Sequence, residues 1–494
     1  MHEGLDRRSF LAGAGATLLS GCGAAALSAT ATTRKQSRVP RTLKQAMRGH
    51  VFTEGDPGFP GVAHIYNERF DGVLPHWVAR PIDAADVRGA VRWAVAHDVP
   101  LRARSGGHSY AGYSTLSGGA VLDLRRMNSV QVDRSHGIAR IGPGAQLIDV
   151  YARLAAHGAT LPAGSCPSVG ITGVTLGGGM GLAARAFGMT ADNLVGAQIV
   201  TADGRLRQVD KHTDPGLLWA LRGGGGGNFG VVTQLQLRIH RLPSSAAYFN
   251  VSWPWSSAAE ALMAWLQWAP HTRDQITSIF HLNFDRTVSA NGQYLGPSSD
   301  LPGLLSALTS VPGASLGRFD SGYLALQMFL AGCSHLSLPA CHTVGTAPGG
   351  TLSRALFWAK SDYLTHPLPI SGAQALVSAM DRHQSQGVPG SAAILFDAYG
   401  GAINRVAPGA TAFVHRNALC AMQYLAYNGG ASWLDQTYAS MRPYVSGMAY
   451  QNYIDAGLST WRQAYYGANY RRLLAVRRRV DPQHFFKFPQ AVGR

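Results

Sequence analysis

Residues 104–110 read RSGGHSY, and residues 163–181 read AGSCPSVGITGVTLGGGMG. The first stretch places His108 behind two glycines, and the second places Cys166 ahead of a run of glycines. Because glycine has no side chain, it lets the backbone approach a ligand closely and lets N–H groups converge on phosphate. A histidine and a cysteine supplied by two such loops could ligate a metal or carry an organic cofactor.

The overall composition is that of a large folded protein without a nucleic-acid function. The chain has 494 residues with a hydrophobic content of 46%, which predicts two or three domains. Its formal net charge of +16 favours anionic ligands or surfaces. Lys and Arg are scattered apart from a group at residues 471–479, and we find no nucleic-acid-binding motif. We therefore expect no nucleic-acid partner.

Residues 1–39 are predicted to be an export signal and a linker rather than part of the fold. Arg7 and Arg8 begin a twin-arginine signature, and an apolar run follows to Leu19. The next residues, ending at Cys22, resemble a bacterial lipobox; a plain signal peptide cut near Ala29 is the alternative. The signature predicts export by the twin-arginine route to the periplasm, cell envelope or medium, with membrane tethering through Cys22 left open.

The remaining cysteines divide by their surroundings. Cys333 and Cys341 can close a small loop, and we favour a disulfide over two thiols in an exported protein. Cys420 lies between apolar neighbours and is interpreted as a buried small side chain. Cys166 is left over, in the most unusual stretch of the chain.

Residues 74–243 are predicted to form an α+β nucleotide-binding domain, because strands, helices and glycine loops alternate there. Strands are expected at 74–81, 99–103, 120–124, 195–201, 205–208 and 229–239. Helices are expected after the N-cap Asp83, at 145–157 and at 217–221.

Residues 244–449 are richer in aromatic residues and predict a second, substrate-binding domain with an antiparallel sheet. A helix is expected at 258–268, and strands at 277–283 and 392–399. Four tryptophans could line a sugar platform, but most are interpreted as core: Trp253, Trp255, Trp265 and Trp268. Residues 450–494 are separate again, with a helix that stops at Asp481-Pro482 and arginines interpreted as a solvated face.

Several familiar sites are not supported by the motifs. GGGGGN at residues 223–228 lacks the Lys and Ser/Thr of a Walker loop, and LGGGMG at residues 176–181 resembles a dinucleotide fingerprint only loosely. His108 and Cys166 have no companions at metal-ligand spacing, so no metal site is expected. A hydrolase with Cys166 as nucleophile is formally open.

The motifs resemble those of the berberine bridge enzyme-like branch of the vanillyl-alcohol oxidase flavoproteins. The resemblance runs from about residue 74 to residue 492 and includes RSGGHSY, GSCPSVG, DPGLLWALRGGGGGNFGVVT, YYGANYRRL and DPQHFF. It implies a PCMH-type FAD-binding domain, a substrate domain with an antiparallel sheet and helices, and a C-terminal segment completing the FAD site. It also implies FAD held by two covalent bonds, from His108 to the 8α-methyl carbon and from Cys166 to carbon 6.

The same resemblance implies a cofactor shell around these two residues. Glycine-rich backbone is expected to wrap the pyrophosphate and to lie along the flavin ring. The shell comprises Arg104, Ser105, Gly106, Gly107 and Ser109 of the first loop, Val169, Gly170, Thr172 and Gly173 of the second, and Asn228, Val232 and Asn469.

Residues 450–455 read YQNYID and match the family's Y-x-N-Y segment. The resemblance implies that Tyr453 is the general base and Tyr450 its helper; two packed tyrosines are the alternative. A tyrosine titrates near pH 10 unperturbed, so the base needs a nearby positive charge or the oxidised flavin to act at neutral pH. Val169 falls where the family gates oxygen, and a small residue there is associated with oxidases.

The sequence therefore predicts an exported FAD-dependent oxidase that takes hydride from an alcohol, sugar or secondary-metabolite hydroxyl. The expected partners are a small-molecule substrate and O2, which would yield hydrogen peroxide. A flavin dehydrogenase using a quinone or another acceptor is the nearest alternative, and a non-catalytic flavin-carrying surface protein is an alternative of another class.

Overall fold

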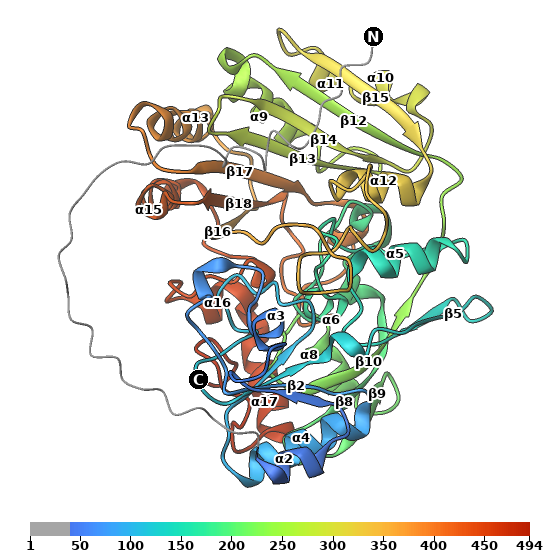
Figure 1. Cartoon of the computed structure of the whole chain (residues 1–494). Coiled ribbons are helices and arrows are strands. Elements are labelled where there is room, and N and C mark those ends of the chain that lie inside the picture. Colours follow the sequence, from blue (N-terminus) through green and yellow to red (C-terminus); the bar gives the residue numbers. More distant parts are fainter. Residues whose placement is uncertain (1–39) are drawn as a thin grey trace, which may run out of the picture.

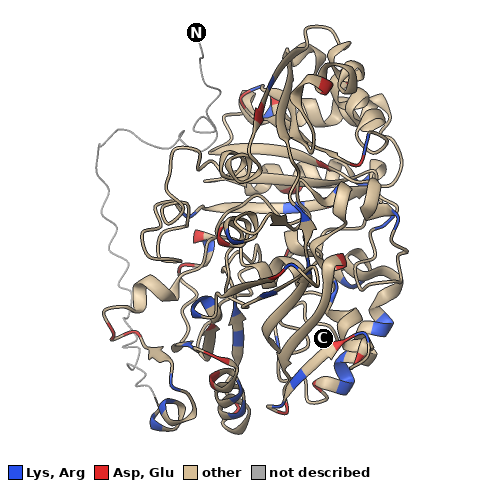
Figure 2. Ribbon diagram, turned by 90° about the vertical axis from the view of Figure 1, so that its right-hand side faces the viewer, with Lys and Arg blue, Asp and Glu red and all other residues tan. Residues whose placement is uncertain are grey.

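The computed structural model describes residues 40–494, so the predicted signal with Arg7, Arg8 and Cys22 lies outside the described residues. Figure 1 shows an upper layer built on one large sheet and a lower layer with smaller sheets. This mixture of helices and antiparallel sheets confirms the α+β prediction. Within residues 40–494, no helix combines the length and apolar character needed to cross a bilayer. Lys and Arg are spread over many segments (Figure 2).

The lower layer contains a four-stranded sheet in the order β1-β2-β4-β3. Strands β2 (Trp77–Arg80), β4 (Ala120–Asp123) and β3 (Leu101–Arg104) are parallel, and β1 (His50–Phe52) pairs antiparallel with β2. Helix α4 (Ala84–Ala96) joins β2 to β3 and begins after Asp83, whose carboxylate accepts the Asp86 N–H at 3.0 Å. Because the parallel strands end at one edge, the RSGGHSY loop and the turn after Asp123 leave the sheet together.

The second sheet of the lower layer is antiparallel, in the order β5-β6-β10-β8-β9. Its strands are β5 (Val130–Asp133), β6 (Ile138–Ile141), β8 (Leu194–Val200), β9 (Leu206–Asp210) and β10 (Val231–Arg238). The short strands β7 (Ala159–Thr160) and β11 (His240–Arg241) pair beside it. Helix α5 (Leu147–Ala155) is followed by Gly158 at φ +64°, the left-handed turn that glycine supplies after a helix.

The upper layer is a seven-stranded antiparallel sheet in the order β15-β12-β14-β13-β17-β18-β16. Its strands are β12 (Ala246–Trp253), β13 (Ile276–Asn283), β14 (Val288–Tyr294), β15 (Ser315–Ser321), β16 (Phe357–Leu364), β17 (Ser391–Ala398) and β18 (Cys420–Tyr427). Helices α9 (Ala258–Trp268), α13 (Ile370–Ser385) and α15 (Ala431–Ser440) share one apolar core with one face of the sheet. Because side chains alternate along a strand, Phe396 and Met422 enter that core, while Asp397 and Gln423 lie on the other face.

The four tryptophans belong to this core, as most were predicted to. Trp253 and Trp265 are buried, and Trp255 and Trp268 pack against the same cluster. All four indole N–H groups donate to acceptors of the domain itself. A sugar platform built from them is therefore not supported.

The remaining α-helices before residue 450 are shorter. They are α2 (Arg41–Ala46), α3 (Phe59–Ala63), α6 (Ile171–Leu176), α7 (Ala184–Phe187), α8 (Pro215–Leu221), α10 (Leu301–Leu304), α11 (Ser306–Thr309), α12 (Tyr323–Leu330) and α14 (Gly401–Asn404). The chain ends with α16 (Trp461–Tyr466) and α17 (Tyr470–Val480), which share the core of the lower layer.

The prediction that the arginines of α17 form a solvated face was wrong for Arg477. Its side chain is buried and donates to the carbonyls of Asn228 at 2.6 Å and Phe486 at 2.5 Å. It also pairs with the buried carboxylate of Asp481 at 3.0 Å. A buried charge needs such partners, so Arg477 fastens the C-terminal segment to the glycine-rich loop before β10.

Candidate functional site

The RSGGHSY loop is held at its base by Arg104, which ends β3. The Arg104 guanidinium is buried and donates to the carbonyls of Val62 at 2.5 Å, Ala63 at 3.2 Å and Ser114 at 3.0 Å. Burial lowers the pKa of Arg104 to about 10, which still leaves it charged at neutral pH. Its side chain thus fixes the loop, and only its backbone is left to face a ligand.

The glycines of the two loops allow the loops to touch. A Cβ atom on Gly106 would lie 2.3 Å from the nitrogen of Gly170, and a Cβ atom on Gly170 would lie 2.0 Å from Ser105 Oγ. The Ser105 hydroxyl donates to the carbonyl of Pro143 at 2.6 Å, and Gly107 has a φ of +82°. Contacts among these predicted shell residues therefore bring the loops that carry His108 and Cys166 together.

The His108 ring is half-buried and oriented by two neighbours. Its Nε2 atom lies 2.9 Å from Ser168 Oγ, which in turn lies 2.6 Å from Thr343 Oγ1. The ring stacks on Tyr66 with centroids 4.1 Å apart. Burial lowers the pKa of His108 to about 3, so the imidazole is neutral and keeps the lone pair that a covalent bond to carbon requires.

Cys166 takes no part in the Cys333–Cys341 disulfide, and its side chain is exposed. Burial raises the pKa values of Tyr66, Tyr110 and Tyr427, and proximity to Cys166 contributes to each rise. Since Tyr66 also stacks on His108, the two predicted attachment residues lie near the same group of aromatic side chains.

Residues on α6 and next to it leave a buried hydroxyl and open space that suit a large polar cofactor. The hydroxyl of Thr172 is buried without a hydrogen-bond partner in the described chain, and a Cβ atom on Gly173 would meet open space. Val169 is half-buried just before this helix, and Val232 is buried on β10. These residues fit FAD, since a buried hydroxyl is expected to meet an acceptor or donor.

Three predicted shell residues use their side chains within the protein. Ser109 Oγ accepts the Tyr113 N–H at 3.0 Å. The Asn228 amide donates to Gly224 O at 2.9 Å, and its oxygen accepts the N–H of Val492 at 2.9 Å. Asn469 donates to three carbonyls, those of Pro408, Thr411 and Ala412. These contacts tie the loops and the C-terminal segment together, so direct cofactor contacts by these side chains stay predictions.

Tyr453 forms a hydrogen bond with a buried carboxylate, that of Asp397. Its hydroxyl donates to Asp397 Oδ2 at 3.2 Å, and its ring stacks on Tyr110 with centroids 5.4 Å apart. The Tyr110 hydroxyl accepts an N–H of Gln423 at 2.8 Å. Burial raises the pKa of Asp397 to about 6, while the hydrogen bond from Tyr453 opposes the rise. The pair therefore joins a phenol to a carboxylate that is mostly ionised at neutral pH.

The Tyr450 hydroxyl is held by hydrogen bonds within the protein, and its role as helper stays a prediction. Its hydroxyl oxygen accepts the N–H groups of Gly179 at 2.9 Å and Met180 at 3.0 Å, and the amide of Asn452 at 3.0 Å. Burial raises its pKa to about 12 despite these donors. Tyr450 thus anchors the YQNY turn on the LGGGMG loop, and its ring meets that of Tyr453 with centroids 4.9 Å apart.

The sequence reasoning missed Asp397 and Asn452. Asp397 was visible as the single acid in the apolar strand SAAILFDA, where alternation places it opposite Phe396. Asn452 donates to Val174 O at 2.9 Å, and a Cβ atom on Gly177 would lie 2.0 Å from its side-chain oxygen. The glycine at 177 therefore admits Asn452, a role that the glycine run alone does not reveal.

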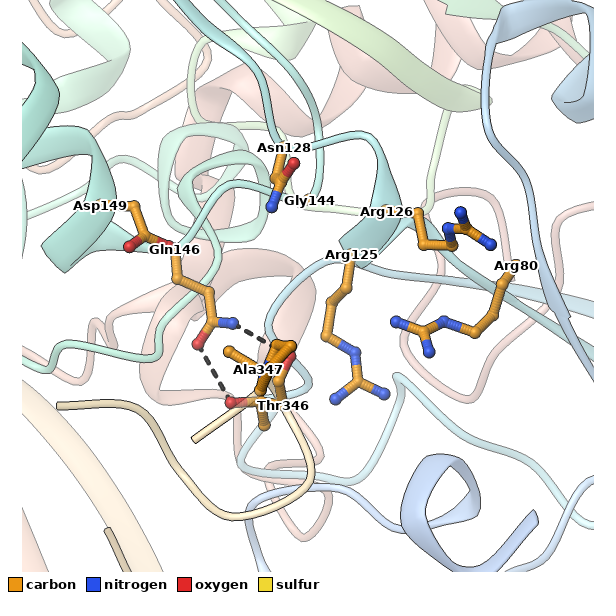
Figure 3. Close-up of a pocket in the computed structure, with 10 residues that line it drawn as sticks. Arg80, Arg125, Arg126, Asn128, Gly144, Gln146, Asp149, Thr346 and Ala347 are labelled. Carbon is orange, nitrogen blue, oxygen red and sulfur yellow. Dashed lines mark hydrogen bonds between the residues drawn. The ribbon is translucent and has the colours of Figure 1, made fainter. Parts of the chain in front are cut away.

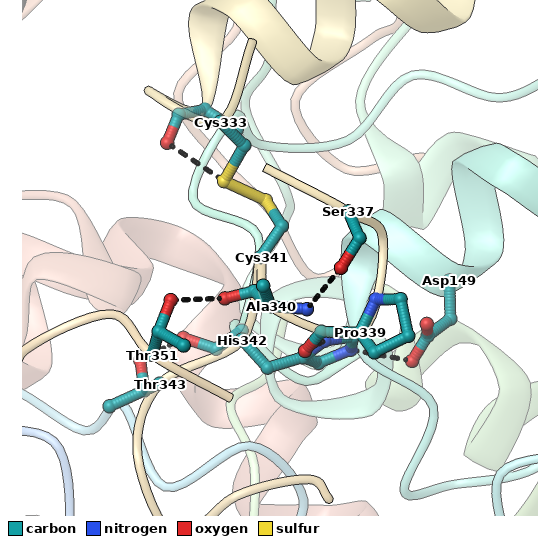
Figure 4. Close-up of a disulfide and its surroundings, with 11 residues drawn as sticks. Asp149, Cys333, Ser337, Pro339, Ala340, Cys341, His342, Thr343 and Thr351 are labelled. Atoms are coloured by element: carbon teal, nitrogen blue, oxygen red, sulfur yellow. Dashed lines mark hydrogen bonds and ion pairs between the residues drawn. A yellow bond between two sulfur atoms is a disulfide. The ribbon is translucent and has the colours of Figure 1, made fainter. Parts of the chain in front are cut away.

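The predicted disulfide between Cys333 and Cys341 is present, with Cα atoms 5.7 Å apart (Figure 4). It closes a loop that leads directly to His342, whose Nε2 atom lies 3.0 Å from Asp149 Oδ2. The next residue, Thr343, reaches Ser168 and so supports His108. Cys420 is buried, as predicted. Within residues 40–494, no group of three His, Cys, Asp or Glu side chains is arranged to hold a metal.

Comparisons with known proteins agree with this geometry. Residues 75–210 match the family described as FAD binding domain, and residues 449–493 match the family described as berberine and berberine like. The uncharacterized FAD-linked oxidoreductase YgaK of Bacillus subtilis (strain 168) is 32% identical over 465 residues, which cover 91% of this chain and 98% of that protein. The berberine bridge enzyme-like protein Cyn d 4 of Cynodon dactylon is 30% identical, with 90% of each chain covered.

Solved structures extend the comparison to the whole fold. BBE-like 1 of Physcomitrella patens has a TM-score of 0.84 at 29% identity, covering 91% of this chain and 99% of that one. Xylooligosaccharide oxidase from Myceliophthora thermophila C1, in complex with xylobiose, has a TM-score of 0.82 at 26% identity, covering 91% and 98%. Together with the matched FAD-binding and C-terminal regions, these likenesses show that the chain belongs to the berberine bridge enzyme-like family of FAD-linked oxidoreductases.

Proposed function

We propose that this protein is an oxidase that converts a CH–OH group of a sugar or a related alcohol to a carbonyl and reduces O2 to hydrogen peroxide. The observation that carries the proposal is the Tyr453–Asp397 pair, whose tyrosine stacks on Tyr110, one of the tyrosines near Cys166. The similarity to an oligosaccharide oxidase solved with xylobiose supports a sugar as the substrate class.

FAD, when bound, supplies the two-electron chemistry that joins oxidation of the substrate to reduction of O2. In our proposal, His108 and Cys166 hold it covalently, and Thr172 and the backbone of residues 105–109 and 169–173 complete its shell. The neutral His108 ring, positioned by Ser168 and Tyr66, and the exposed Cys166 side chain support this assignment.

The proton of the substrate hydroxyl goes to Tyr453 Oη in the proposed reaction. Tyr453 cannot accept it as a neutral phenol, and burial raises its own pKa well above the usual value. However, its hydroxyl already donates to Asp397 Oδ2, so Tyr453 can pass its proton to the carboxylate as it takes the proton of the substrate. Asp397, with a pKa of about 6, is mostly ionised at neutral pH and ready to accept.

Aromatic side chains beside Asp397 hold the substrate in this proposal. Tyr110 and Tyr453 present stacked rings, and Gln423 fixes the Tyr110 hydroxyl. Positioning of the reacting carbon against such rigid groups lowers the entropic part of the barrier. Val169, half-buried between Cys166 and α6, is the proposed gate for O2.

The attachment is tested by acid precipitation of the purified protein and four variants: His108→Ala, Cys166→Ala, the double variant and Cys420→Ala as the cysteine control. We expect flavin in the pellet of the wild type, of each single variant and of the control, and none with the double variant. A colourless wild-type pellet with free FAD in the supernatant would show that the attachment is not covalent.

The reaction is tested by mixing the protein anaerobically with a panel of mono- and oligosaccharides and simple alcohols. A substrate should bleach the flavin absorbance, and admission of air should restore it with one H2O2 formed per reduced flavin. Bleaching that only an added quinone reverses would mean a dehydrogenase, and no bleaching by any member of the panel would contradict the sugar or alcohol substrate.

We also propose export by the twin-arginine route, with Cys22 as the site of a lipid anchor. The sequence of residues 7–22 and the Cys333–Cys341 disulfide support this location, because disulfides persist in oxidising compartments. Replacing Arg7 and Arg8 by Lys should retain the protein in the cytoplasm, and Cys22→Ala should abolish labelling by a fatty acid. Export of the double-lysine variant would contradict the route.

A further inference from the structure

A cavity lies at the carboxyl edge of the parallel sheet (Figure 3). Its volume is about 410 Å³, within the range of small-molecule sites. Arg80 comes from the end of β2, and Arg125 and Arg126 come from the turn after β4. The opposite wall is formed by Gln146 and by the segment at residues 346–348.

The charges that line this cavity do not balance. One buried carboxylate, that of Asp123, serves two of the arginines: it binds Arg125 at 2.6 and 2.8 Å and lies 3.6 Å from Arg80 Nε. Arg126 adds a third, exposed cation. The one carboxylate of the lining, Asp149, is already paired with His342 at 3.0 Å. The wall therefore carries an excess of positive charge.

Arg80 makes an ion pair but no hydrogen bond at this place. Its buried Nε atom faces Asp123 Oδ2 at 3.6 Å, beyond hydrogen-bond distance among the described residues. The Arg80 and Arg125 guanidinium groups point toward one another in Figure 3, and Arg125 Nη1 is fixed by the carbonyl of Gly345 at 2.8 Å. Planar guanidinium groups bind phosphate through paired hydrogen bonds, and a buried donor without an acceptor favours such a ligand.

We propose that this cavity binds the phosphate group of a small molecule, either inorganic phosphate or a phosphomonoester. A phosphate dianion offsets the excess charge of Arg80, Arg125 and Arg126 and supplies an acceptor for Arg80. The space left beside Asn128 and Gln146 accommodates a short polyol or sugar chain of a phosphomonoester. None of the proposed flavin-attachment or proton-transfer residues lines the cavity, and Gln146 of its wall pairs with Gly170 of the proposed flavin shell.

The test measures binding of inorganic phosphate and of glycerol 3-phosphate to the flavin-loaded protein by calorimetry, at ionic strength held constant with sodium chloride. We expect saturable binding of at least one of the two ligands. Tighter binding of glycerol 3-phosphate would identify an organic phosphomonoester, and binding of inorganic phosphate that is equal or tighter would identify the free anion. An absence of saturable binding by both would overturn the proposal.

Variants locate the site. Arg126→Gln removes an exposed side chain and should raise the dissociation constant at least about threefold, because it removes a charge-assisted contact. The double variant Arg80→Gln with Arg126→Gln removes two such contacts and should raise the dissociation constant at least about tenfold. Arg134→Gln is the matched control, because it removes one exposed positive charge from the loop between β5 and β6; binding should stay within about twofold. Because Arg126 is exposed, its variant keeps the fold even if the double variant does not. An Arg126→Gln protein that binds as tightly as the control would place the phosphate elsewhere and overturn the proposal.

Discussion

Replacement of Asp397 by asparagine tests the proton path most directly. The amide keeps the shape of the side chain and can still accept a hydrogen bond from Tyr453, but it cannot take a proton. A general base contributes about 10² to 10⁴-fold to a rate, so the rate of flavin reduction should fall by a factor in that range. In the wild type, the rate of flavin reduction should rise with pH around a pKa of about 6, that of Asp397. This rise, the limb near pH 6 of the pH profile, should be absent from the variant.

The same substitution has a predictable effect on stability. Burial raises the pKa of Asp397 from 3.8 to about 6, so the folded protein holds this proton more tightly than the unfolded chain does. The contribution to stability is complete below pH 3.8 and is lost as the pH rises through about 6. The shift corresponds to about 3 kcal/mol, and the Asp397→Asn protein should therefore lose less thermal stability between pH 4 and pH 7.

Stopped-flow reduction under anaerobic conditions and thermal melts across this pH range measure both effects. Asp362→Asn is the matched control, because Asp362 is a second buried carboxyl of the sheet, with a pKa raised by burial to about 7. It lies on the helix-covered face beside Arg442, so its replacement should alter the melts and leave the pH profile of flavin reduction unchanged. An Asp397→Asn protein that reduces its flavin within about threefold of the wild-type rate, with the limb near pH 6 intact, would refute the proposed path.

Three further changes test other parts of the site. Tyr453→Phe should slow flavin reduction by about 10²-fold or more while the acid-precipitated protein stays yellow; equal reduction kinetics would remove Tyr453 from the mechanism. Val169→Ile should slow reoxidation of the reduced protein by air, and an unchanged rate would mean that oxygen enters elsewhere. Replacing both Cys333 and Cys341 by serine opens a loop with a sequence separation of 8. This change should lower the free energy of unfolding by about 2.5 kcal/mol, seen as a lower melting temperature; an unaltered melt would argue that the loop is held by its other contacts.

Local features of the fold were predictable from the sequence. Helix α9 occupies the predicted residues 258–268, and the antiparallel pair β8–β9 corresponds to the strands predicted at 195–201 and 205–208. These elements depend on short-range periodicity and turn residues, which the sequence displays directly. The order of the seven-stranded sheet was not predictable, because β13 pairs with β17 across more than a hundred intervening residues.

Site residues that the sequence did not predict also depend on contacts between segments far apart in the chain. Motifs pointed to His108 and Cys166, but the partner of Tyr453 lies on a strand far away in sequence, so Asp397 emerged only with the three-dimensional structure. Arg477 looked like a surface residue because neighbouring arginines are exposed; its burial depends on carbonyls from a distant loop. Likewise, the amide of Asn469 meets carbonyls at residues 408–412 that no local pattern links to it.

The alternation of side chains along β17 and β18 has a consequence for how this protein can diversify. Odd-numbered positions of the two strands, such as 395, 397 and 423, face away from the helix-packed core, whereas even-numbered positions such as 394, 396 and 422 belong to it. Substrate preference can therefore change through the odd face, for instance at the half-buried residue 395, while the even-numbered codons keep the domain folded. A library at position 395 would sample new specificities and leave Asp397, Gln423 and the loops that carry His108 and Cys166 untouched.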